Sequence, residues 1–164
     1  MGGKEKILIL GIGNTLLSDD GAGIYVAAKL KDKLNRPDTT ILELAVSGLA
    51  LLDFLTGYEK AIIIDAIQTT GGKPGQVYRL TPEAFDIAQH ITSPHGIDFR
   101  TTLELGKKLG LPLPREIIIY AIEAADVSTF SEQCTAPVRK AISSCVNMIL
   151  RELETENTVL DETD

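Results

Sequence analysis

The segment at positions 11–21, GIGNTLLSDDG, constrains the fold more than any other part of this chain. It follows an apolar run at 7–10 that predicts a buried strand, and it precedes a helical pattern that begins near Asp20. The segment is therefore predicted to turn the chain from a strand into a helix. Open α/β sheets bind their ligands at such turns, beside the carboxyl ends of the strands, so we expect the functional site here.

Apolar, β-branched runs alternate with helical patterns along the chain. Strands are predicted at 6–10, 40–44, 61–65, 76–80 and 116–121, and helices at 20–35, 48–56, 99–109 and 131–154. Continuous apolar strands between helices predict an α/β fold whose mainly parallel sheet is covered on both faces. The turn GGKPG at 71–75 predicts a hairpin between the third and fourth strands, so that one strand runs antiparallel. We expect one domain at 1–154, followed by an acidic, disordered tail at 155–164.

Composition narrows the possible partners. The formal net charge of −7, without a basic cluster, is unfavourable for binding nucleic acid or an anionic membrane surface. The amino-terminal residues do not resemble a signal peptide, and no apolar run approaches the roughly 20 residues of a membrane span. We therefore expect a cytoplasmic protein with no membrane or nucleic-acid partner. We expect a monomer, because no exposed apolar stripe is evident.

The two cysteines, Cys134 and Cys145, lie 11 residues apart on one apolar stripe of the predicted last helix. They lack the Cys-x-x-Cys spacing of common metal and redox motifs. We interpret them as buried thiols in a reducing compartment.

The strand-to-helix turn does not fit a nucleotide loop. Gly11 and Gly13 match the first two glycines of a dinucleotide fingerprint, but Leu16 stands where the third is required. Asp19 and Asp20 would also repel a phosphate group. A simpler interpretation is that Ser18 or Asp19 caps the helix. A single cap, however, does not account for Asn14 and both carboxylates.

Two further residues are candidates for chemistry. Asp65 ends the apolar strand and is predicted to lie at the same edge of the sheet as the first turn, although it could also cap a local turn. His95 lies between Pro94 and Gly96 in a loop, where a histidine is often only solvated; His90 has no such setting. If the first, third and fourth strands are neighbours, Asp20, Asp65 and His95 can converge as a metal site with open coordination positions. Spacing alone does not establish this site.

Taken together, these motifs resemble those of the hydrogenase maturation proteases. The resemblance rests on GIGNTLLSDDGAG after the first strand, on Asp65-Ala66 after a later strand, and on Ser93-Pro94-His95. It extends from about position 7 to about position 153. The implied fold is a three-layer α/β sandwich, of the phosphorylase/hydrolase-like kind, with a five-stranded twisted sheet; residues 1–154 would form the protease domain.

The resemblance also implies an activity. Members of this family are endopeptidases that remove a C-terminal extension from the precursor of the NiFe hydrogenase large subunit after nickel insertion. The family's metal-contacting and catalytic positions match Asp20, Asp65 and His95. The implied metal is nickel supplied by the nickel-loaded precursor, and the resemblance implies that other divalent ions can take its place in crystals.

The sequence departs from the family pattern at two places that bear on the site. Position 20 is often Glu in the family and is Asp here, which shortens the side chain by one methylene. The segment at 43–48, ELAVSG, replaces a glycine-rich segment thought to help recognise the substrate. Two alternative functions stay open at this point: a non-catalytic nickel-sensing assembly chaperone, and a different peptidase or hydrolase on the same fold.

Overall fold

Five strands form a single sheet in the order β2-β1-β3-β5-β4, in which β4 alone is antiparallel to its neighbour. The computed structural model describes residues 3–46, 48–88 and 98–161, with 157–161 as backbone only. The strands are β1 (Ile7–Ile12), β2 (Thr39–Leu44), β3 (Lys60–Ile67), β4 (Val77–Leu80) and β5 (Glu116–Glu123). The predicted α/β class, with a mainly parallel sheet and one antiparallel strand, is confirmed.

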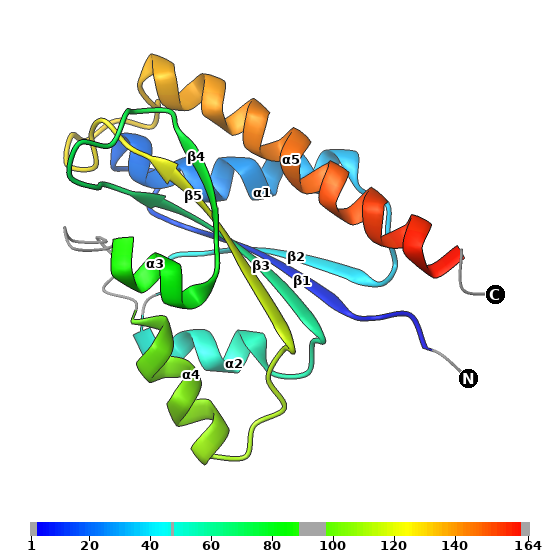
Figure 1. Ribbon diagram of the computed structural model, residues 1–164. Helices are drawn as coiled ribbons and strands as arrows, with labels where there is room; N and C mark the ends of the chain where they lie inside the picture. The colour runs from blue at the N-terminus through cyan, green and yellow to red at the C-terminus, as the bar shows by residue number, and fades with distance from the viewer. Residues whose placement is uncertain (1–2, 47, 89–97, 162–164) are drawn as a thin grey trace.

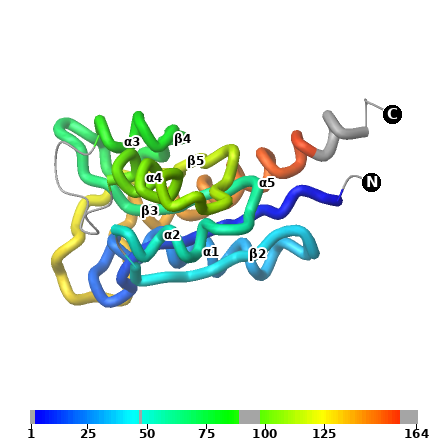
Figure 2. Tube along the Cα trace, turned by 90° about the horizontal axis from the view of Figure 1, so that it is seen from below, coloured from blue at the N-terminus to red at the C-terminus, as the bar shows by residue number. Residues whose placement is uncertain are grey.

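Helices cover both faces of this sheet and complete three layers (Figure 1). One face carries the short 3-10 helix η1 (Ser18–Gly21), α1 (Ala22–Lys33) and α5 (Ala136–Asp161). The other face carries η2 (Gly48–Ala50), α2 (Leu51–Leu55), α3 (Pro82–Ala88) and α4 (Phe99–Lys108). Figure 2 views the molecule from this second face, with α2 and α4 in front of the strands. None of the helices in the described ranges combines the length and the apolar character that a membrane span requires.

The alternation of side chains along the strands divides the core into two halves. Ile62 and Ile64 of β3 pack into the half under α1 and α5, whereas Ile63 and Ile67 pack into the half under α2, α3 and α4. Every residue of β1 and β3 is buried, as expected for parallel strands covered on both sides. Phe85 of α3 meets Phe99 of α4 edge to face, with ring centroids 5.2 Å apart.

The expected hairpin between the third and fourth strands is wrong. β5 lies between β3 and β4, and within the described ranges β5 is the one strand that pairs with β4. Burial explains this order: the apolar residues from Ile118 onward in β5 are fully covered, whereas β4 is only partly buried and suits the edge of the sheet. The turn at 71–75 therefore carries the chain past the position that β5 occupies.

The carboxyl-terminal part of the chain also differs from expectation. The last helix begins at Ala136 rather than at 131, and it continues to Asp161, so the predicted tail at 155–164 is helical over most of its length. An ion pair holds this last part of the helix on the sheet: Glu156 pairs with the ammonium group of Lys60, which is buried in β3. Helix α3, at 82–88, was not predicted.

Both cysteine thiols are free and buried, which confirms their predicted burial; the reducing compartment stays a prediction. Cys145 lies in α5, whereas Cys134 precedes that helix rather than belonging to it. Burial raises the pKa of the Cys134 thiol to about 11 and that of Cys145 to about 12. Neither thiol has the low pKa of a reactive nucleophile.

Helix α1 packs so closely on the sheet that its backbone contacts the strand backbone, because two glycines face each other. A Cβ atom on Gly23 would lie 2.3 Å from the carbonyl oxygen of Ile64 and 2.5 Å from that of Ile12. A Cβ atom on Gly11 would lie 2.3 Å from the carbonyl oxygen of Gly23. Hydrogen in place of a side chain at both positions therefore sets the distance between α1, β1 and β3.

Replacing Gly23 by Ala tests this contact. Alanine normally stabilises a helix interior by about 1 kcal/mol relative to glycine. Here the added methyl group would meet strand backbone, and overpacking of this kind costs about 1–3 kcal/mol. We expect Gly23→Ala to lower the free energy of unfolding in urea by about 2 kcal/mol. The control is Gly3→Ala, where nothing lies within 4 Å; equal stability of the two variants would contradict the contact.

Candidate functional site

Two of the three predicted site residues, Asp20 and Asp65, lie at the carboxyl edge of the sheet. Asp65 stands near the end of β3, paired in register with Ala121 of β5, and its side chain is 1% exposed. Its Oδ1 accepts a hydrogen bond from the amide of Ala66 at 2.9 Å. Asp20 lies in η1 and is likewise 1% exposed, with Oδ2 accepting from the amide of Asn14 at 3.1 Å.

The fold brings the segments that carry these two carboxylates together. Gly13 allows the turn after β1 to fold tightly against η1, because a Cβ atom there would lie 2.2 Å from the carbonyl oxygen of Asp20. Three residues further on, Gly23 abuts the carbonyl oxygen of Ile64, which immediately precedes Asp65. The expectation that both residues lie beside the carboxyl ends of neighbouring strands therefore agrees with the geometry. Their chemical roles stay predictions.

His95, the third predicted site residue, and the comparison residue His90 lie outside the described residues. Across the described ranges, no three His, Cys, Asp or Glu side chains are grouped so that they could hold a metal ion. The described part of the proposed ligand set thus consists of Asp20 and Asp65. Carboxylate oxygens suit divalent cations, and an imidazole would add the borderline character that nickel accepts.

Asp19 has a different role from the helix cap that the sequence suggested. The residue at the N-cap of α1 is Gly21, and neither η1 nor α1 has a side-chain cap. The carboxylate of Asp19 is fully buried and accepts hydrogen bonds from the amides of Ala125, Asp126 and Thr135 at 2.7–3.0 Å. The Thr135 hydroxyl also donates to it, at 2.8 Å from Oδ2. Asp19 therefore fixes the loop between β5 and α5 against the turn after β1.

Backbone pairing reinforces this junction between the two loops. The amide of Ser18 donates to the carbonyl of Ser131 at 2.8 Å, and the amide of Ser131 donates to Leu16 at 2.9 Å. Ser18 has a φ of +50°, the one positive value among the non-glycine residues that the structure describes. The buried Asp19 and the flanking backbone bonds hold this uncommon conformation two residues before Asp20.

The sequence did not lead us to a fourth buried carboxylate, Glu123, at the end of β5. This side chain is 2% exposed and accepts hydrogen bonds from the Thr69 amide at 2.7 Å, the Thr69 hydroxyl at 2.9 Å and the Tyr78 hydroxyl at 3.2 Å. It anchors the loop after β3 and the first part of β4. The signal was present, because Glu123 ends an apolar strand in the same way as Asp65.

The match to known proteins agrees with this fold. The family model described as hydrogenase maturation protease matches residues 24–152. The hydrogenase expression/formation protein HupD of Bradyrhizobium diazoefficiens is 28% identical, over 88% of this chain and 76% of that protein. The hydrogenase 2 maturation protease of Escherichia coli is 32% identical, over 65% of this chain and 70% of its own length.

Solved structures show the same fold. The hydrogenase maturating endopeptidase HybD of E. coli superimposes with a TM-score of 0.78 at 24% identity, over 92% of this chain and 93% of that one. The protein is thus an α/β endopeptidase, a hydrolase. The chain belongs to the hydrogenase maturation protease family.

Isosteric substitutions at Asp19 and Asp20 should separate stability from activity. An amide at position 19 would present NH₂ hydrogens to backbone donors, and each buried donor left without its acceptor costs about 1–3 kcal/mol. We therefore expect Asp19→Asn to lower the free energy of unfolding by about 2–3 kcal/mol in urea. Asp20→Asn should keep most of the stability while losing peptidase activity.

The matched control for this pair is Asp32→Asn, on the exposed side of α1. A surface substitution of this kind should change the free energy of unfolding by no more than about 0.5 kcal/mol. If Asp19→Asn were as stable as Asp32→Asn, the structural role assigned to Asp19 would be wrong.

Proposed function

We propose that this protein removes the C-terminal extension of a NiFe hydrogenase large-subunit precursor after nickel has been inserted. Family membership supports this reaction, and the single structural observation that carries it is the pair of buried carboxylates, Asp20 and Asp65, at the carboxyl edge of adjacent parallel strands. The substrate is the nickel-loaded precursor, and the enzyme acts as a cytoplasmic monomer.

In this proposal the nickel ion belongs to the substrate, and Asp20, Asp65 and His95 are the residues that contact it. Nickel could polarise the scissile carbonyl or lower the pKa of a bound water, or it could only dock the precursor. In the docking alternative, one of the two carboxylates acts as the general base toward the attacking water. The reaction is hydrolysis in either case: water adds across the amide bond, and the released peptide carries the new amino terminus.

The surroundings of the carboxylates favour the recognition of a cation. Electrostatic attraction is stronger in a shielded site than in bulk water, and both side chains are almost fully withdrawn from solvent. Each has one oxygen oriented by a nearby amide, from Asn14 for Asp20 and from Ala66 for Asp65. Such orientation reduces the reorganisation required when a ligand binds. An Asp at position 20 shortens the reach of this ligand but leaves its charge unchanged.

The test is cleavage of the nickel-loaded precursor, followed by mass spectrometry of the released C-terminal peptide. We expect the wild-type protein to release a single peptide. Asp65→Asn and His95→Ala should reduce cleavage at least 100-fold, because each removes a contact to the ion or a base that contributes about 10²–10⁴-fold. His90→Ala is the matched control and should cleave normally.

A nickel-free precursor tests the role of the metal separately. If the ion bridges the two proteins, the empty precursor should be cleaved at least 100-fold more slowly, and adding nickel during precursor maturation should restore cleavage. Full-rate cleavage of the empty precursor would exclude nickel gating while leaving the peptidase activity intact. Normal cleavage by Asp65→Asn and His95→Ala would exclude the site assignment.

A further inference from the structure

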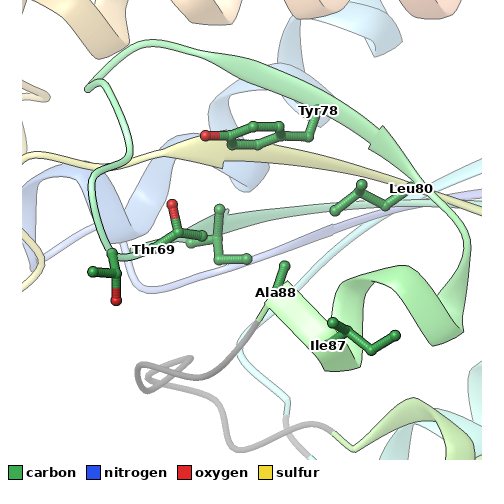
Figure 3. A pocket seen from close by; sticks show the side chains of 7 residues that line it. Thr69, Tyr78, Leu80, Ile87 and Ala88 are labelled. Atoms are coloured by element: carbon green, nitrogen blue, oxygen red, sulfur yellow. The ribbon is translucent and has the colours of Figure 1, made fainter.

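A pocket of about 370 Å³ opens on the face of the sheet that carries α3 (Figure 3). Tyr78 and Leu80 of β4 form one side of it, and Ile87 and Ala88 at the end of α3 form the other. The end of β3 and the loop that follows complete the wall with Ile67, Thr69 and Thr70. Pockets that bind small ligands commonly enclose about 300–1,000 Å³, so this one can hold one or two side chains.

The pocket begins two residues along β3 from the candidate catalytic residue Asp65. Ile67 lies two residues after Asp65 on β3, and residues two apart along a strand point to the same face. Their separation along the strand is about 6.6 Å, which is also the spacing of same-side residues in an extended peptide. A peptide whose cleaved bond lies beside Asp65 can therefore place a neighbouring side chain at the pocket.

The walls of this pocket are fixed before any ligand binds. Glu123, buried beneath them, accepts hydrogen bonds from both Thr69 and Tyr78, and thereby joins the loop after β3 to β4. Gly72 closes against this group, because a Cβ atom there would lie 2.3 Å from both the Glu123 carboxyl carbon and the Thr69 hydroxyl. A pre-formed pocket of this kind binds its ligand with less loss of conformational freedom.

The chemistry of the lining selects the occupant. The described residues that line the pocket are all uncharged, and Ile67, Leu80 and Ala88 contribute hydrocarbon surface. A charged side chain placed there would lose its hydration, and the carboxylate beneath the wall, Glu123, already accepts hydrogen bonds from Thr69 and Tyr78. An apolar side chain would instead gain about 25 cal/mol for each Å² removed from water.

We propose that this pocket is a specificity subsite that binds an apolar side chain of the precursor peptide beside the cleaved bond. The inference rests on the proposed function and extends it from the reaction to the sequence that the enzyme selects. Glu123 is a positioning residue for this subsite, because it acts through Thr69 and Tyr78 rather than on the peptide.

The first test uses the wild-type protein and a panel of nickel-loaded precursors. Each apolar residue within four positions of the cleaved bond is replaced, one at a time, by Asp and by Ala. We expect one position at which Asp lowers kcat/KM at least about tenfold and Ala lowers it less, in line with the selectivity of apolar enzyme pockets.

The second test narrows the pocket. Thr70→Trp adds bulk at its exposed rim, and Ala88→Phe fills it from α3. Both variants should raise KM for the natural precursor about tenfold with little change in kcat. Their KM should rise much less, relative to the wild-type protein, for the precursor in which Ala replaces the residue at the sensitive position. The matched control is Ser143→Trp, an equally large addition at an exposed position of α5, on the opposite layer.

The outcomes separate the subsite from the proposed function. If the wild-type protein cleaves no precursor, the proposed function is wrong. If it cleaves but tolerates Asp at every position, or if Thr70→Trp and Ala88→Phe match Ser143→Trp on all precursors, the subsite is overturned. The subsite is also overturned if the pocket variants lose the same fraction of kcat/KM on every precursor. Thermal unfolding of each variant identifies one that fails to fold.

Discussion

The architecture of the candidate site depends on one backbone contact, the approach of α1 to β1 and β3 at Gly23. The carbonyl groups of Ile12 and Ile64 fill the space that a side chain would need. This contact fixes the start of α1 relative to β3, and η1 is continuous with that start. A shift of α1 away from the sheet would carry Asp20 away from the end of β3, so the packing distance of one helix controls the geometry of the site.

Four buried acidic residues gather around the carboxyl ends of β1, β3 and β5, and they divide into two kinds. Asp19 and Glu123 are saturated by amide and hydroxyl donors from loops distant in sequence, and their function is to hold those loops. Asp20 and Asp65 each have a nearby amide that orients one oxygen. The first pair builds the rigid frame in which the second pair is proposed to act, and such a supporting shell is typical of precise functional sites.

Local patterns in the sequence predicted the parts of this protein that depend on local physics. Apolar runs located the strands, and the end of the run at 62–64 placed Asp65 at the edge of the sheet. The position of β5 could not be predicted in this way. It depends on a comparison between strands: β5 is more apolar than β4 and needs neighbours on both sides, so β4 is left at the edge of the sheet. Asp19 was misassigned for a similar reason: its partners lie more than 100 residues away, near Ala125 and Thr135. Glu123 met the same criterion as Asp65 and was overlooked.

The hydrogen bonds of Asp19 have a consequence for how this surface can diverge among related enzymes. One carboxylate grips both ends of the loop between β5 and α5, at Ala125 and at Thr135. Between those anchors Ser131 pairs with the turn after β1, and its neighbour Phe130 forms an exposed tip, with 84% of its surface accessible. Substitutions at the tip can accumulate without displacing the frame beneath it. The hydrogen bonds of Asp19 thus make the position of the loop's two ends independent of the sequence at its exposed tip.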